Sequence, residues 1–84
     1  MIFIALKTIE DAKKLARICE KYEQEMNVDV ITSRYILDGA SLFCLMSILG
    51  KVVELRPDTD DYLLKTYFLR DVEKIGGYEV RLDG

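Results

Sequence analysis

The 84-residue sequence has no histidine and no tryptophan, only one proline and only two cysteines. Without histidine, and with so few cysteines, it offers no ligand set for a transition metal such as zinc. Cys19 and Cys44 each lie in a helical apolar pattern, where cysteine usually behaves as a small buried hydrophobic residue. Because no export signal is recognised, the sequence predicts reduced thiols and a cytoplasmic protein.

Long apolar runs and basic clusters are also missing. The first apolar run, residues 1–6, is short and is followed by Lys7, so it predicts a strand and not a signal peptide or membrane span. The net charge is −3 and nearby acids offset each basic residue, so we expect neither nucleic acid nor a membrane as a partner. Asp58, Asp60 and Asp61 lack the glycine and the distal glutamate of a calcium loop, so no metal or other cofactor is predicted.

The composition that is present indicates one folded domain. Hydrophobic residues make up 50% of the chain and charged residues 32%, a balance typical of a globular protein and not of a disordered segment. A chain of this length supports a single core. We therefore predict one domain over residues 1–77 and a short tail over residues 78–84.

The pattern of apolar residues predicts the order strand, helix, strand, strand, helix, strand, helix. After the first strand, Thr8 with Asp11 three residues later is close to a capping box and begins the first helix. Its predicted apolar face consists of Ala12, Leu15, Ala16, Cys19, Tyr22 and Met26.

Two strands over residues 28–31 and 35–37 are predicted to form a hairpin with its turn near Thr32-Ser33. A further strand over residues 52–55 should stop at Arg56-Pro57. Asp58 or Thr59 should begin a last helix that Gly76-Gly77 ends. Its predicted apolar stripe is Leu64, Tyr67, Phe68, Val72 and Ile75. This order of strands and helices predicts an α+β fold, a largely antiparallel four-stranded sheet with three helices on one face.

Residues 38–49 predict a short helix that is apolar on nearly every side, capped by Ser41 and ended by Gly50. So short a helix on a small domain cannot bury all its apolar residues. We expect Leu45, Ile48 and Leu49 to face the core. Leu42, Phe43 and Met46 should then form a binding surface, although core packing is the alternative for them.

The tail alternates apolar and charged residues from Tyr78 to Asp83, as a strand buried on one face does. It is predicted to pair with a free sheet edge, its own or a neighbour's. A frayed terminus is the alternative.

Three stretches resemble the histidine-containing phosphocarrier (HPr) family of the bacterial phosphoenolpyruvate-dependent sugar phosphotransferase system. They are the end of the first helix from Glu20-Lys21-Tyr22 to Met26-Asn27-Val28, the hairpin after it, and residues 40–48 around Ser41. The resemblance extends from about residue 2 to residue 75. It implies the family's fold, an open-faced β-sandwich with the element order βαββαβα.

The resemblance fails at the position that carries the family's chemistry. The family's phosphorylated histidine and the arginine that follows it fall at about Thr8 and Glu10, and this chain has no histidine. A threonine ester would not pass its phosphate onward, and Glu10 and Asp11 would repel an incoming phosphate. We therefore expect a non-catalytic binding or regulatory module, not an enzyme. Its partners would be phosphotransferase-system proteins or transcription regulators.

Several residues keep two interpretations. Ser41 matches the family's regulatory serine, while its simpler role is a helix cap. Thr8, Glu10 and Asp11 form a cap and first turn, or their carboxylates permanently mimic a phosphorylated histidine. Leu42, Phe43 and Met46 match positions that the family uses against enzyme I and sugar-permease domains. Two alternatives to the binding module are a phosphocarrier-type protein phosphorylated on Ser41 or Thr8, and a structural homodimer.

Overall fold

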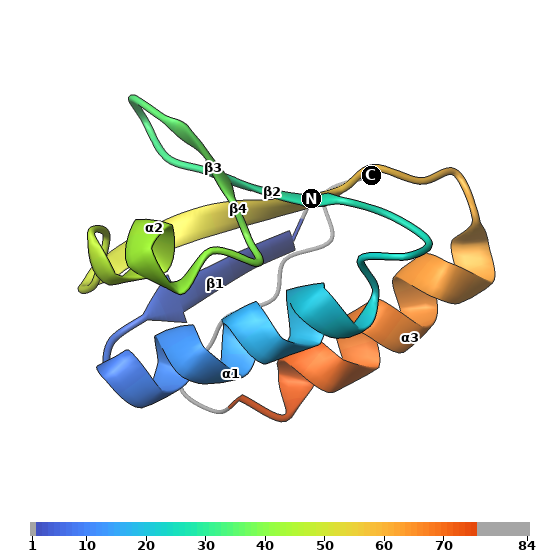
Figure 1. Ribbon diagram of the computed structural model, residues 1–84, viewed down its shortest axis with the longest axis horizontal. Coiled ribbons are helices and arrows are strands. Elements are labelled where there is room, and N and C mark those ends of the chain that lie inside the picture. The colour runs from blue at the N-terminus through green and yellow to red at the C-terminus, as the bar shows by residue number, and fades with distance from the viewer. Residues whose placement is uncertain (1, 76–84) are drawn as a thin grey trace.

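The computed structural model describes residues 2–75 (Figure 1). Within this range the chain forms four strands and three helices in the predicted order. Their bounds are β1 Ile2–Leu6, α1 Ile9–Lys21, β2 Val28–Ile31, β3 Ile36–Asp38, α2 Leu42–Met46, β4 Lys51–Pro57 and α3 Tyr62–Glu73. The predicted stop at Gly76-Gly77 and the predicted tail strand lie outside the described residues.

The strands form one antiparallel sheet in the order β1-β4-β2-β3. β1 and β4 pair from Ile2 opposite Leu55 to Leu6 opposite Lys51, so the first strand lies beside the last. Along β1 buried and half-buried residues alternate, as they do when only one face of a strand meets the core. Figure 1 shows α1 and α3 side by side along the sheet. The predicted α+β class with an antiparallel four-stranded sheet and three helices is confirmed.

The core lies between the sheet and the helices, with Phe68 of α3 fully buried in it. The Tyr22 ring packs edge-on against Phe68, with 5.8 Å between ring centroids and 80° between ring planes. Such a pair is favourable because the positive ring edge meets the negative ring face. It fixes the end of α1 against the middle of α3.

α1 begins as the sequence predicts. The Thr8 hydroxyl accepts a hydrogen bond from the Asp11 amide, and the Asp11 carboxylate accepts one from the Thr8 amide, which completes a capping box. All six residues of the predicted apolar face are buried. α1 ends at Lys21, so the buried Met26 belongs to the turn that follows the helix.

β4 is longer than predicted, because it continues through Arg56 and Pro57. Pro57 lies opposite Val28 of β2, and among the described residues β1 pairs with β4 from Lys51 to Leu55. Backbone N–H groups alternate between the two sides of a strand, and the Asp58 amide donates to Asn27 on the β2 side. The nitrogen of Pro57 therefore faces away from β2, so the proline removes no donor from the pairing of β2 with β4.

α3 begins at Tyr62, later than predicted, because the Asp61 carboxylate caps it by accepting hydrogen bonds from the Leu63 and Leu64 amides. The prediction that Tyr67 joins the buried stripe is wrong, since 52% of it is exposed. Leu69 packs against the core in its place and lines the same hollow as Ile2 and Leu55. Tyr67 and Leu69 flank Phe68 on opposite sides of the helix, and the sheet lies on the Leu69 side.

α2 is shorter than predicted, since Asp38 belongs to β3 and the helix covers only Leu42–Met46. Gly39 separates the two elements and donates a 2.9 Å hydrogen bond to the Val28 carbonyl. A Cβ atom there would lie 2.8 Å from the Cys19 sulfur, so the chain passes α1 too closely for any side chain. After α2, Gly50 adopts the left-handed region (φ 87°), and its amide donates to the Leu6 carbonyl at the start of β4.

Candidate functional site

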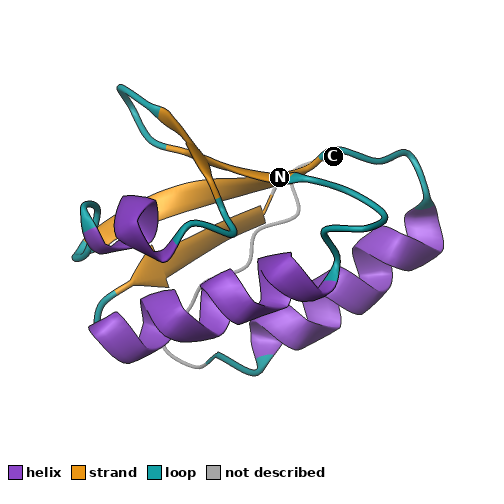
Figure 2. Cartoon of the chain, viewed as in Figure 1, coloured by secondary structure: helices purple, strands orange, loops and turns teal. Residues whose placement is uncertain are grey.

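The candidate site is the outer side of α2, seen in Figure 2 as one short helix beside the strands. The Ser41 hydroxyl caps the helix by accepting a 3.4 Å hydrogen bond from the Cys44 amide. At its end the Ser47 hydroxyl donates a 2.6 Å hydrogen bond to the Cys44 carbonyl. These two serines satisfy backbone groups at the helix ends, so a helix of little more than one turn persists.

The two sides of α2 differ sharply. Leu45 is fully buried, and Ile48 just after the helix is buried in the same core. Phe43 is 90% exposed and Met46 is 41% exposed. The prediction that part of this segment faces outward is thus confirmed for these two residues, which we call the α2 surface.

Leu42 does not share this outward position. It is half-buried, packs against the core and lines a hollow of about 270 Å³ between α1 and α2. Ala16, Lys13 and Arg17 of α1 line the same hollow. The structure therefore joins Leu42 to the middle of α1 and places it at the border of the α2 surface. Leu49 is half-buried and packs against the core, the side on which it was predicted to lie.

Thr8, Glu10 and Asp11 lie together at the start of α1, and local contacts occupy all three. Asp11 accepts hydrogen bonds from the Lys7 and Thr8 amides, each at 3.1 Å, and Thr8 accepts from Asp11. Glu10 pairs with Lys13 at 3.5 Å. None of the three lines the hollow between α1 and α2. They fulfil the simpler of their two predicted roles, cap and first turn.

The two thiols differ in accessibility. Cys19 is buried against Gly39, and burial, with a smaller contribution from the Asp38 carboxylate, raises its pKa to about 12. It therefore remains a protonated, unreactive thiol at neutral pH. Cys44 is half-buried on α2. Within residues 2–75 no three His, Cys, Asp or Glu side chains lie close enough to hold a metal ion, and no helix is long and apolar enough to cross a membrane.

A second feature, which the sequence pattern did not predict, is a groove between α1 and the end of α3. Four basic side chains line it, Lys14, Arg17 and Lys21 from α1 and Lys74 from the end of α3. Spacings of three and four residues put the α1 members on one helical face, and this was the available signal. The expectation that each basic residue is offset by acids holds for Lys21, which pairs with Asp71, whereas within residues 2–75 no carboxylate lies within ion-pair distance of Lys14 or Arg17.

One carboxylate, Asp71, organises the α3 side of this groove. It accepts a 2.7 Å hydrogen bond from the Tyr22 hydroxyl and a 2.9 Å bond from Lys21, while Lys74 lies 3.8 Å away. The Tyr22 hydrogen bond, followed by that of Lys21, lowers the pKa of Asp71 below its usual value. Burial and the same Asp71 contact raise the pKa of Tyr22. Asp71 is therefore a satisfied anion under neutral conditions.

Comparison with family models, with curated proteins and with solved structures gave no match.

Proposed function

We propose that this protein is a non-catalytic, HPr-like binding or regulatory module that docks onto other proteins of a bacterial cytoplasm through its α2 surface. The observation that carries the proposal is the 90% exposure of Phe43 beside the partly exposed Met46. A large aromatic and a methionine held outward on a capped helix are the kind of groups that anchor protein interfaces.

The HPr-like assignment draws support from the element order and from the antiparallel four-stranded sheet with three helices. Both are compatible with what the sequence resemblance implies. On this proposal the partners are phosphotransferase-system proteins or transcription regulators, and the resemblance implies that enzyme I and sugar-permease domains contact the corresponding positions in the family.

A non-catalytic role agrees with the chemistry at the start of α1. The Thr8 hydroxyl is used as a cap, and two acidic side chains stand in the first turn. An incoming phosphate would meet negative charge there instead of the cation that phosphate binding requires. Without histidine the chain also has no nucleophile for a labile phosphoramidate.

The test is competition with a true phosphocarrier. Purified enzyme I, phosphoenolpyruvate and an authentic HPr protein are mixed with increasing amounts of this protein, and phosphate transfer to HPr is followed. We expect inhibition, with no acid-labile phosphate on this chain. Phe43→Ser with Met46→Ser should weaken inhibition at least about tenfold, because each apolar anchor contributes roughly 1–3 kcal/mol when a partner covers it.

A matched control is available on α3, where Tyr62 and Leu63 are also exposed. Tyr62→Ser with Leu63→Ser removes comparable apolar area elsewhere and should leave inhibition unchanged. Acid-labile label on this chain at a rate comparable to HPr would refute the non-catalytic role. A solution mass of two chains that Phe43→Ser with Met46→Ser returns to one would favour the homodimer instead.

A further inference from the structure

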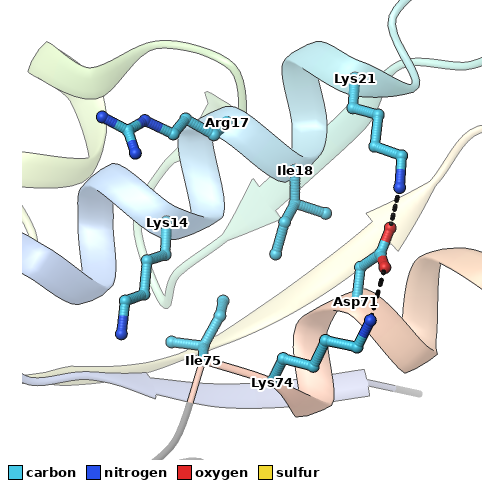
Figure 3. A pocket seen from close by; sticks show the side chains of 7 residues that line it. All are labelled: Lys14, Arg17, Ile18, Lys21, Asp71, Lys74 and Ile75. Atoms are coloured by element: carbon cyan, nitrogen blue, oxygen red, sulfur yellow. Dashed lines mark hydrogen bonds and ion pairs between the residues drawn. The ribbon is translucent and has the colours of Figure 1, made fainter.

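The α1–α3 groove, defined by Lys14, Arg17, Ile18, Lys21, Lys74 and Ile75, combines an apolar floor with a basic rim. Figure 3 shows Ile18 and Ile75 in its middle, with Lys14 and Arg17 on one side and the Lys21–Asp71–Lys74 group on the other. Ile75 is buried and Ile18 half-buried. The groove has a volume of about 330 Å³, near the lower end of the roughly 300–1,000 Å³ typical of small-molecule sites.

The charge of this groove is opposite to that of the whole chain. The chain carries −3, whereas the groove sets four basic side chains against the single carboxylate of Asp71. That carboxylate is already occupied by Tyr22, Lys21 and Lys74. An excess of positive charge therefore faces a partly apolar hollow.

Local helix energetics explain only part of this charge. Lys21 lies in the last turn of α1 and Lys74 caps the end of α3, where the helix dipole favours cations. Lys14 and Arg17 lie inside α1, where the dipole has no such effect. Among residues 2–75 no carboxylate lies within ion-pair distance of either one.

We propose that the α1–α3 groove binds a small organic anion, a phosphate or carboxylate attached to an apolar body. The apolar body lies on Ile18 and Ile75, and the anionic group is held by Lys14. Arg17 adds positive charge on the same side, with its side chain extending away from Ile75 (Figure 3). The anion takes this side because Lys21 and Lys74 already share the Asp71 carboxylate as an ion-pair partner. Charge-assisted hydrogen bonds supply the attraction, and the apolar floor selects organic anions over inorganic ones.

The experiment titrates the full chain with phenyl phosphate, inorganic phosphate and benzyl alcohol while backbone amide NMR signals are recorded. Saturable shifts centred on Ile18 and Ile75 are expected with phenyl phosphate. Inorganic phosphate and benzyl alcohol, which each supply only one half of the ligand, should bind at least about tenfold more weakly. Equal affinity for inorganic and phenyl phosphate, or shifts spread over all surface lysines, would overturn the proposal.

Adjacent lysines provide a matched pair of variants. Lys14→Glu and Lys13→Glu change the net charge equally, but Lys13 does not line the groove. Lys14→Glu should weaken phenyl phosphate binding about tenfold or more, while Lys13→Glu should change it less than about twofold. Both side chains are exposed, and an unchanged amide spectrum outside the substituted turn verifies that each variant is folded. Equal weakening by the two would mean that only net charge attracts the ligand, and the site would be refuted.

Discussion

The α2 surface and the α1–α3 groove are built in opposite ways. The α2 surface comes from a single segment, and its apolar side chains point outward because their neighbours Leu45 and Ile48 point inward. The groove joins two helices, and its central contact links residues as far apart in the sequence as Lys21 and Asp71. One is apolar and the other basic. A continuous segment can thus offer a surface for a macromolecule, while a small-ligand site needs the fold to assemble it.

The two regions also depend on the core differently. Phe43 contributes little to the core because it is almost fully exposed, so the position of the α2 surface depends on the buried Leu45 beneath it. The groove depends on Asp71, which holds two lysines through polar contacts at the protein surface. Substitution of Leu45 should therefore affect the α2 surface, and substitution of Asp71 should affect the groove.

The largest effect is expected for Leu45→Ala. Removing a fully buried leucine leaves a cavity and should lower the free energy of unfolding by about 2–5 kcal/mol. Urea denaturation measures the change, and Phe43→Ala is the matched control on the same helix. The control should stay within about 0.5 kcal/mol of the wild type, as exposed positions usually do. Equal losses for the two variants would show that α2 does not divide into an inner and an outer side.

Features of the fold that depend on one continuous segment could be predicted from the sequence, and features that depend on contacts between distant segments could not. The strands, the capping box at Thr8 and the outward position of Phe43 were predictable because each depends on residues close together in the chain. The end of β4 was not, since Pro57 fits in the strand because its nitrogen faces away from β2, which only the pairing of the strands decides. The start of α2 after its cap Ser41 was predictable, but its end at Met46, before Gly50, was not.

The same limit applies to the candidate sites. Leu42 seemed equivalent to Phe43 and Met46 in a helical pattern, yet contact with α1 draws it toward the core. The basic residues seemed neutralised along the chain, yet Lys74 at the end of α3 lines the same groove as Lys14 and Arg17 of α1 only after folding. Local patterns report helix faces, whereas the packing angle of two helices decides which faces meet.

A smaller effect is expected for Asp71→Asn, which removes the negative charge that Tyr22, Lys21 and Lys74 contact. Hydrogen bonds to a charged group contribute roughly 1.5–3 kcal/mol, and partial solvent screening places the expected loss near the lower end of that range. Urea denaturation at neutral pH measures it. Glu73→Gln, at an exposed neighbouring position, is the control and should be nearly neutral. Asp71→Asn should still compete with HPr through the α2 surface. Such a result would show that the α2 surface does not depend on the groove.

The pH dependence gives Asp71 a second signature. Because folding lowers its pKa below the ordinary value of 3.8, its contribution is complete above that value and is lost as the pH falls through the lowered pKa. The stability of the wild type should therefore decline more steeply than that of Asp71→Asn between about pH 5 and pH 2. Parallel curves for the two proteins would show that the carboxylate is not stabilised by its partners.

The smallest effect is expected for Ser41→Ala at the start of α2. Loss of an N-cap typically costs about 0.5–2 kcal/mol, and the long 3.4 Å bond from the Cys44 amide places this cap at the lower end. Ser41→Asp should retain the cap, because a carboxylate also accepts from that amide and suits a helix start. The melting temperature should thus fall slightly for Ser41→Ala and stay at the wild-type value for Ser41→Asp. The affinity of the groove for phenyl phosphate should be unchanged in both variants. If Ser41→Ala is as stable as the wild type, the hydroxyl is not needed to begin α2, and its predicted role as a regulatory phosphorylation site gains weight.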